Sequence, residues 1–158
     1  MQTVLEKLKI KKASSHDWSE ILDLMKETGR TVFFAGSESY EKFYLVRDPD
    51  TNKILCSFAI ESEDEIAVLK FFGVRKSLQK NGVGKYVANK TCELMKKNGI
   101  KRFYASTWEA PEFWRKTLFK EIKISEIKDK YFLNYLKQLE KSFPYEYSNL
   151  LVNFCFSA

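Results

Sequence analysis

The chain of 158 residues lacks several features that would place it in particular classes of protein. It has three cysteines and one histidine. Each cysteine lies in an apolar stretch, and the three share no metal-like spacing, so we expect buried structural thiols and no metal site. No apolar run approaches the ~18 residues of a membrane span. The opening MQTVLEKLKIKK contains no apolar signal-peptide core. We therefore expect a cytoplasmic location, with the nucleus as the alternative, and no membrane partner.

The basic excess of the chain is concentrated in one segment. The formal net charge is +6, from 27 basic and 21 acidic residues. The segment 71–90 contains five basic residues and no acidic one, and the two signs nearly balance in the rest of the chain. This distribution favours one local polyanion over a general electrostatic footprint for DNA or RNA, so no nucleic-acid partner is expected. The five residues are Arg75, Lys76, Lys80, Lys85 and Lys90.

Hydrophobic periodicity predicts a mixed order of strands and helices. An alternating pattern predicts an opening strand at 4–10, and Asp17 with Glu20 forms a D-x-x-E capping box for a helix that ends near Gly29. Residues 42–60 are typical of a hairpin around Asp48-Pro49-Asp50. The later elements are a strand at 66–75, a helix at 83–98, a strand at 101–107, a short helix at 110–118, a strand at 120–126, a helix at 128–142 and a strand at 149–156.

The segment QKNGVG at 79–84 lies between a predicted strand and a predicted helix. This arrangement binds phosphate groups, because a helix N-terminus has unpaired N–H groups and a partial positive charge. Two common phosphate loops do not fit. The Walker loop needs glycine at 79 and Ser or Thr at 86, where Gln79 and Tyr86 stand, and the dinucleotide fingerprint needs glycine at 87, where Val87 stands. The pattern Q/R-x-x-G-x-G/A is satisfied in full, with Gly82 and Gly84 as its glycines.

With this motif and its context, the sequence resembles the GNAT superfamily of acetyl-CoA-dependent N-acetyltransferases. In that family the loop follows a central strand that ends in a small residue and Val or Ile, as Gly73-Val74 does here. A short helix with an F-Y-x-x-x-G-F-like signature comes later, and FWRKTLF stands in that place. The resemblance to the family is clear over 54–122, whereas at the two ends of the chain it rests only on the order of the predicted strands and helices. It implies one α/β (α+β) domain over 1–158, with a mixed, mostly antiparallel twisted sheet of about six or seven strands flanked by helices.

The resemblance implies that acetyl-CoA is the cosubstrate and assigns residues to it. The N–H groups of residues 80–84 would hold the pyrophosphate, and the backbone of Phe72 and Val74 would pair with the pantetheine amides. The N–H of Val74, or of a neighbour, would polarise the thioester oxygen. For Arg75, Lys76 and Lys85, a solvated charge and a phosphate contact are both open. The predicted coenzyme-binding residues are Phe72, Gly73, Val74, Gln79, Lys80, Asn81, Gly82, Val83, Gly84, Lys85, Trp114 and Lys116.

Two positions depart from the family pattern. Trp114 stands where the family often has a tyrosine that protonates the departing thiolate, and an indole N–H is no useful acid at neutral pH. Val68 stands where histone-type members have a glutamate base. We predict Glu65 and Val74 as the catalytic residues, although strand alternation directs Glu65 away from the Val68 face unless a bulge intervenes. A solvated turn charge is the other interpretation of Glu65. The acidic residues that could act through a water are Glu61, Glu63, Asp64 and Glu65.

The acceptor is predicted to be a small amine, such as an amino-sugar phosphate of the glucosamine 6-phosphate type. A basic protein tail would favour an acidic groove, and only ESEDE at 61–65 offers one. The segment 128–147 is predicted to form a wall of the acceptor cleft, with Tyr131 and Tyr135 binding the acceptor; core packing is the other interpretation of its tyrosines, which include Tyr145 and Tyr147. A protein lysine or histone acetyltransferase, and an inactive CoA-binding domain, remain alternatives. Exchange of the last strand between two copies, giving a homodimer, is compatible with the family.

Overall fold

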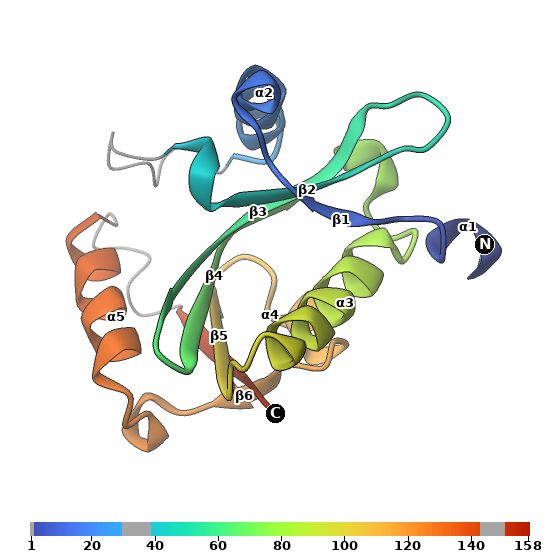
Figure 1. Cartoon of the computed structure of the whole chain (residues 1–158). Helices are drawn as coiled ribbons and strands as arrows, with labels where there is room; N and C mark the ends of the chain where they lie inside the picture. Colours follow the sequence, from blue (N-terminus) through green and yellow to red (C-terminus); the bar gives the residue numbers. More distant parts are fainter. Residues whose placement is uncertain (1, 30–38, 143–150) are drawn as a thin grey trace. The chain divides into compact units, whose positions relative to one another are not determined.

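A seven-stranded sheet organises the chain in the computed structural model, which describes residues 2–29, 39–142 and 151–158 (Figure 1). The strand order is β1-β2-β3-β4-β5-β7-β6. β4 and β5 pair in parallel, while β1 with β2, β2 with β3, β5 with β7 and β6 with β7 pair antiparallel. The predicted mixed, mostly antiparallel sheet is confirmed. Its strands are β1 (Ile10–Lys12), β2 (Phe43–Arg47), β3 (Ile54–Glu63), β4 (Ile66–Val74), β5 (Arg102–Thr107), β6 (Lys120–Ile122) and β7 (Val152–Ser157).

The helices follow the predicted order, with one correction at the N-terminus. They are α1 (Gln2–Leu5), α2 (Trp18–Glu27), α3 (Val83–Lys97), α4 (Pro111–Arg115) and α5 (Lys130–Ser142). The strand predicted at 4–10 is wrong, because α1 occupies the start of that segment and β1 begins at Ile10. Val4, an apolar member of the alternating pattern, is 56% exposed, so no buried face enforces a strand there. No helix within the described residues has both the length and the apolarity to cross a membrane.

The capping box predicted from Asp17 and Glu20 is also wrong, although α2 begins where expected. The box forms one turn earlier, where the side chain of Asp17 accepts the backbone N–H of Ser14 at 2.8 Å. Glu20 instead accepts the N–H of Ile54 at 2.8 Å and a hydrogen bond from Arg47 at 2.8 Å. The side chain of Glu20 therefore connects the first turn of α2 to the hairpin of β2 and β3.

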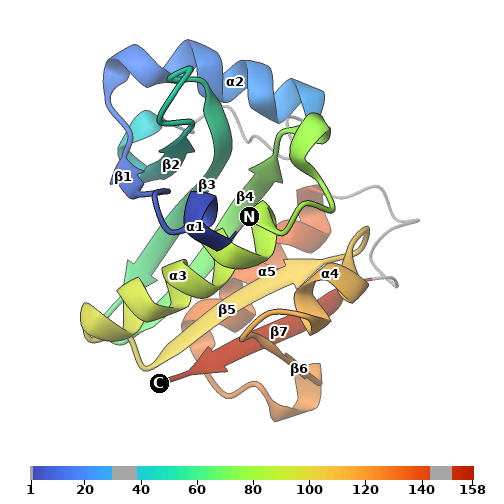
Figure 2. The same ribbon diagram turned by 90° about the vertical axis from the view of Figure 1, so that its right-hand side faces the viewer.

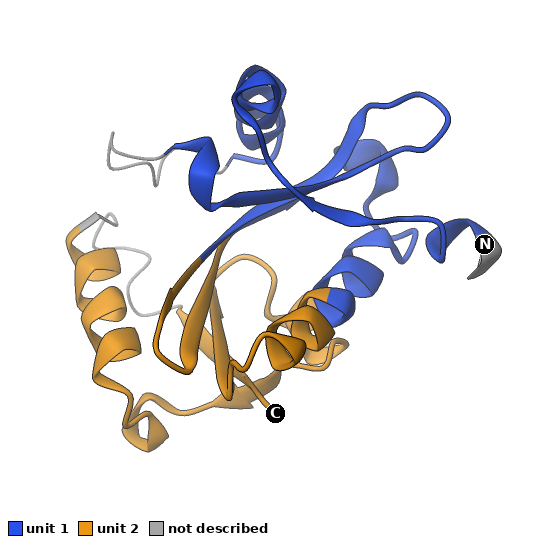
Figure 3. Ribbon diagram, viewed as in Figure 1, with its two compact units in different colours: residues 1–60, 71–90 blue, residues 61–70, 91–158 orange. Residues whose placement is uncertain are grey.

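The chain contains two compact units, and unit 1 comprises residues 1–60 and 71–90 (Figure 3). Its core lies between α2 and the strands β2 and β3. The apolar side of α2 contributes Ile21, Leu24 and Met25, which recur at helical spacing. These side chains pack against β2 residues that alternate along the strand, such as Phe43 and Leu45.

Unit 2 comprises residues 61–70 and 91–158. Figure 2 shows β5, β7 and β6 side by side, with α5 behind them. Tyr104 of β5 stacks on Phe132 of α5 with ring centroids 4.2 Å apart. Phe103 points to the opposite face of β5, where its ring centroid lies 5.2 Å from that of Phe119. The strand predicted at 120–126 is shorter than expected, because β6 ends at Ile122 and a 3₁₀ turn begins at Ile124.

Candidate active site

The end of β4 departs from regular strand geometry at Phe71. The parallel pairing with β5 runs from Ile66 opposite Arg102 to Leu69 opposite Ala105. Phe71 has a φ of +54°, which is uncommon for a bulky residue. Its ring stacks on that of Phe43, with the two ring centroids 6.0 Å apart. Packing inside unit 1 therefore holds an irregular backbone immediately before the predicted coenzyme-binding residues.

The predicted residues Phe72, Gly73 and Val74 follow this irregularity. Phe72 is 9% exposed, and its ring lies 5.7 Å from that of Phe58, so its side chain belongs to the core of unit 1. A Cβ atom at Gly73 would lie 2.9 Å from Oγ1 of Thr28, a separation that real Cβ atoms essentially never show. A side chain at Gly73 would therefore force Thr28, the residue after α2, to move.

The loop after β4 is connected back to the strand by side chains. Arg75 donates its backbone N–H to the carbonyl of Leu55 at 2.9 Å and its Nε–H to the carbonyl of Ile54 at 2.9 Å. Gln79 donates its Nε2–H to the carbonyl of Val74 at 3.1 Å. The first residue of the motif therefore closes the loop onto the end of β4.

Gly82 starts helix α3 without a side-chain cap. The N–H of Tyr86 donates to the carbonyl of Gly82 at 3.0 Å, which makes Gly82 the N-cap residue. Its φ is +82, and a Cβ atom built there would meet nothing within 4 Å. An N-cap side chain ordinarily accepts N–H groups of the first turn, and glycine has none. The first-turn N–H groups of a helix have no acceptor within the helix, so those of Val83, Gly84 and Lys85 can donate to an external acceptor.

Basic side chains surround this helix start. Lys80, with φ 71, and Lys85 are exposed, as are Lys76 and Asn81. Within the described part of the chain, no carboxylate forms an ion pair with Lys80 or Lys85. The amides and the lysines of one short loop thus both present positive charge.

Arg75 is engaged within the protein. Besides its bonds to β3, its Nη1 lies 3.7 Å from Oε1 of Glu27. Of the two interpretations left open by the sequence, this geometry favours a structural role for Arg75 over a phosphate contact.

The acidic residues at the end of β3 and in the turn to β4 differ in exposure. Glu65 lies on the turn, where its exposed carboxylate is 3.1 Å from Nζ of Lys101. Glu63 and Asp64 are exposed as well. The side chain of Glu61 is only 25% exposed and lies 3.4 Å from Nζ of Lys70. Glu61 is therefore the most enclosed of the four carboxylates.

The remaining predicted residues lie in unit 2. Trp114 is 6% exposed and meets Phe119 edge-on at 5.2 Å, while Lys116 is exposed at the end of α4. Tyr131 and Tyr135 are half-buried on α5, where both pack against its apolar cluster. Tyr145 and Tyr147 lie outside the described residues.

Tyr135 also contacts a charged side chain. The ammonium of Lys70 lies 5.4 Å from the centroid of the Tyr135 ring, within the range of a cation–π contact. Lys70 therefore connects Glu61 of β3 with the predicted acceptor helix α5. The sequence pattern alone did not identify Lys70.

The three cysteines are free and buried. Burial raises the pKa of Cys56 far above its ordinary value and that of Cys92 to about 12. Burial also raises the pKa of Cys155. A thiol of raised pKa is a poor nucleophile near neutral pH, because the thiolate is the reactive form.

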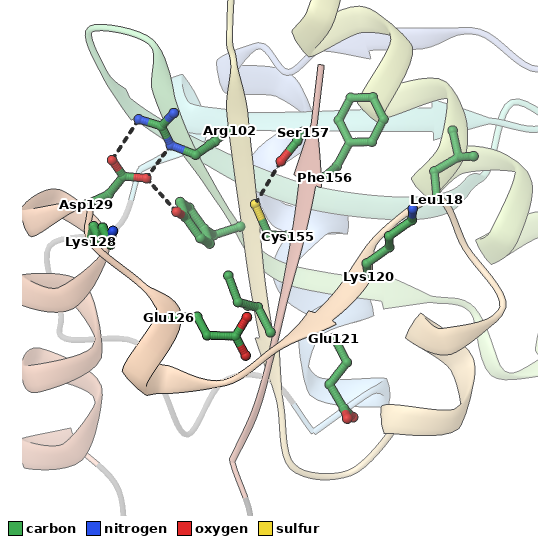
Figure 4. A pocket seen from close by; sticks show the side chains of 12 residues that line it. Arg102, Leu118, Lys120, Glu121, Glu126, Lys128, Asp129, Cys155, Phe156 and Ser157 are labelled. Carbon is green, nitrogen blue, oxygen red and sulfur yellow. Dashed lines mark hydrogen bonds and ion pairs between the residues drawn. The ribbon is translucent and has the colours of Figure 1, made fainter.

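A second polar cluster, which the sequence did not predict, lines a pocket of about 720 Å³ in unit 2 (Figure 4). Asp129 accepts two hydrogen bonds from Arg102, at 2.6 and 2.9 Å, and one from the hydroxyl of Tyr104 at 2.5 Å. We call these three residues the Asp129 cluster. The bonds from Arg102 hold the pKa of the Asp129 carboxyl below its usual value. Burial and the bond to Asp129 raise the pKa of Tyr104.

No protein-family model matches the chain, and no curated protein sequence matches it. Among solved structures, N-acetylglutamate synthase from Neisseria gonorrhoeae, complexed with coenzyme A and N-acetyl-glutamate, is similar with a TM-score of 0.71 and 14% identity. The match covers 95% of this chain and 35% of the synthase, so the chain spans about a third of its length. A GNAT-family acetyltransferase from Staphylococcus aureus has a TM-score of 0.64 and 16% identity, covering 95% of this chain and 98% of that one.

The chain has the fold of GNAT-family acetyltransferases. A third similar structure is the ribosomal-protein-S18-alanine N-acetyltransferase from Escherichia coli, with a TM-score of 0.66 and 12% identity. That match covers 95% of this chain and 93% of the other. The fold predicted from the glycine loop and its context is therefore confirmed.

Proposed function

We propose that the protein is an acetyl-CoA-dependent N-acetyltransferase whose loop at 79–84 binds the coenzyme pyrophosphate. One observation carries the proposal: Gly82 is an N-cap with positive φ, no side chain and open space where a Cβ would stand. The uncapped N–H groups of Val83, Gly84 and Lys85 can donate hydrogen bonds to a diphosphate, and the helix dipole favours its negative charge. Lys80 and Lys85 add charge that the chain does not neutralise by ion pairs among the described residues.

Acetyl-CoA, when bound, supplies the activated acetyl thioester. The backbone at Phe72 and Val74 is assigned to the pantetheine, and the N–H of Val74 or a neighbour to the thioester oxygen. Trp114 and Lys116 stay predictions for the coenzyme, as does Glu65 for the base. We favour Glu61 of β3 for that role, because it is the most enclosed of the four carboxylates at 61–65. A base held away from bulk water can take a proton from the acceptor ammonium directly or through one water.

The acetyl group is proposed to pass directly to the amine. Attack of the neutral amine on the thioester carbonyl forms the amide bond, breaks the carbon–sulfur bond and leaves a thiolate that takes up a proton. An acyl-cysteine intermediate is disfavoured, because Cys56 and Cys92 have no exposed surface and all three thiols have raised pKa values. Conservative replacement of each cysteine by alanine should retain turnover.

The acceptor is proposed to be a small amine that carries an anionic group, such as an amino-sugar phosphate. The half-buried Tyr131 and Tyr135 of α5 offer ring surface and hydroxyl groups for it. Among proteins of this fold, one is an N-acetylglutamate synthase and another is a ribosomal-protein-S18-alanine N-acetyltransferase. A protein amine as acceptor, and a domain that binds CoA without turnover, are the alternatives.

Calorimetry with CoA tests the coenzyme site. Gly82→Asp should abolish binding, because a side chain and a negative charge enter the space assigned to the pyrophosphate. Gly99→Asp is a matched control, since Gly99 has φ +86 and equally open surroundings at the other end of α3. The control should show the same backbone strain and unchanged affinity. Equal affinity in wild type and Gly82→Asp would refute the site.

A thiol-release assay with acetyl-CoA tests the reaction and the acceptor. Amino-sugar phosphates, polyamines and lysine peptides are compared as acceptors, and release should be fastest with the phosphorylated amine. Glu61→Gln should lower kcat by about 10²-fold or more with little change in CoA affinity if Glu61 is the base. CoA binding without release on any amine would favour the inactive domain.

A further inference from the structure

The last turn of α2 contacts the polypeptide on both sides of Val74. Oε2 of Glu27 accepts the backbone N–H of Lys76 at 2.9 Å, and its Oε1 lies 3.7 Å from Arg75. On the other side, Oγ1 of Thr28 occupies the space that a side chain at Gly73 would need. Glu27, the last residue of α2, and its C-cap residue Thr28 therefore contact the segment 73–76 at two points.

The side chains that make these contacts are themselves fixed. The hydroxyl of Thr28 donates to the carbonyl of Leu24 at 2.9 Å, which keeps Oγ1 directed along its own helix. Arg75 is held by the carbonyl of Ile54 at 2.9 Å. The side chains of Glu27 and Arg75 are 32% and 27% exposed, so each is largely covered. The ion pair of Glu27 and Arg75 is therefore partly shielded from water, whereas the bond from Glu27 to the N–H of Lys76 lies at the surface.

The carboxylate of Glu27 is a negative group beside a loop of positive charge. It is directed at the start of a loop whose other charged residues are all basic and to which we assign a polyanion. A negative charge at this place weakens anion binding by Coulomb repulsion. The bond from the carboxylate to the N–H of Lys76 offers a compensating effect, because it fixes the backbone of the turn.

We propose that Glu27, with Thr28, is a positioning residue for the coenzyme site, and this inference rests on the proposed function. Glu27 holds Lys76, Thr28 limits Gly73, and the carbonyl of Val74 is held by Gln79 at 3.1 Å. The backbone that meets the pantetheine and the thioester is thereby ordered before the ligand binds. Ordering in advance raises affinity because binding no longer carries that entropy cost.

Substitution of Glu27 tests the inference by calorimetry with CoA. Glu27→Met keeps the length of the side chain without an acceptor and should weaken CoA binding by about tenfold. Glu27→Gln keeps a carbonyl for the N–H of Lys76 and should recover most of the affinity. Asp23→Ala removes an exposed acidic residue from the same helix and should change affinity by less than about twofold. Glu27→Ala serves in place of the methionine variant if that variant does not fold.

Two further measurements distinguish positioning from general damage. The amide of Lys76 should exchange with solvent faster in Glu27→Met than in wild type, while melting temperatures of the methionine and glutamine variants stay close. In the thiol-release assay, the KM for acetyl-CoA should rise more than kcat falls. Wild-type affinity in Glu27→Met, despite faster exchange at Lys76, would overturn the inference and leave the proposed function intact. Absence of CoA binding in the wild type would overturn both.

Discussion

Replacement of Asp129 by alanine should destabilise the protein mainly through Tyr104. Tyr104 is 2% exposed, so its hydroxyl loses its acceptor at a largely buried position, and a buried hydroxyl without a partner costs about 1–3 kcal/mol. The side chain of Arg102 is 46% exposed and returns to solvent, which limits its share to about 0–1 kcal/mol. We expect a loss of about 2–3 kcal/mol, or roughly 5–10 °C in Tm for a chain of this size.

A double-mutant cycle measured by denaturant unfolding checks this reasoning. Tyr104→Phe should cost about 0.5–1.5 kcal/mol, and in the Asp129→Ala background it should cost nothing, because the unpaired hydroxyl disappears. Asp129→Asn is the control that keeps an acceptor for Tyr104, and its loss should be smaller than that of the alanine variant. If the losses from Asp129→Ala and Tyr104→Phe add within about 0.3–0.5 kcal/mol, the bond between the two residues does not exist in solution.

The pH dependence of the unfolding free energy in acid should also report the ionisation of Asp129. The hydrogen bonds from Arg102 lower the pKa of Asp129 in the folded state, so the folded protein holds its proton less tightly than the unfolded chain. The stabilisation is complete above the unfolded pKa of about 3.9 and is lost as pH falls below it toward the lowered folded value. Asp129→Asn should lack this part of the acid destabilisation. Identical acid profiles of stability would contradict it.

Three other substitutions test single contacts. Gly73→Ala should lower stability by about 1–3 kcal/mol, because the added Cβ would lie 2.9 Å from Oγ1 of Thr28. Thr28→Ala should relieve that loss, and equal losses in both backgrounds would exclude the clash. Ser57→Ala should leave the unfolding free energy unchanged or raise it, because the buried Ser57 hydroxyl has no hydrogen-bond partner among the described residues; a clear decrease would contradict this. Lys116→Ala should weaken CoA binding more than dephospho-CoA binding in calorimetry, and equal weakening would show that Lys116 does not meet the 3′-phosphate.

Local elements were predictable because their signals lie within short stretches of chain. The glycine loop depends on neighbouring residues, and a helix start at Val83 needs only Gly82 and the amphipathic pattern that follows. Gly99 ends α3 with φ +86, a conformation that favours glycine. The alternation of β2 likewise specified which side chains reach the core of unit 1.

The opening segment and the partners of acidic side chains were not predictable in this way. The alternating pattern at 4–10 carried no information on whether a sheet would bury it, and Val4 is exposed. Glu20 satisfies the spacing of a capping box, yet its carboxylate binds Ile54, 34 residues away. A local rule fails where a long-range acceptor or donor competes for the same side chain.

The order of elements along the chain predicted the fold, and the glycine loop at 79–84 indicated where a polyanion is expected, because both depend on local patterns. Which charges that loop can use depends on contacts that form only in the folded protein. Folding engages Arg75 with Glu27 and the carbonyl of Ile54, places Glu27 on the N–H of Lys76, 49 residues away, and joins Arg102 to Asp129 across 27 residues. Such pairs form where folding brings distant segments together, and no spacing along the chain specifies which side chains will meet.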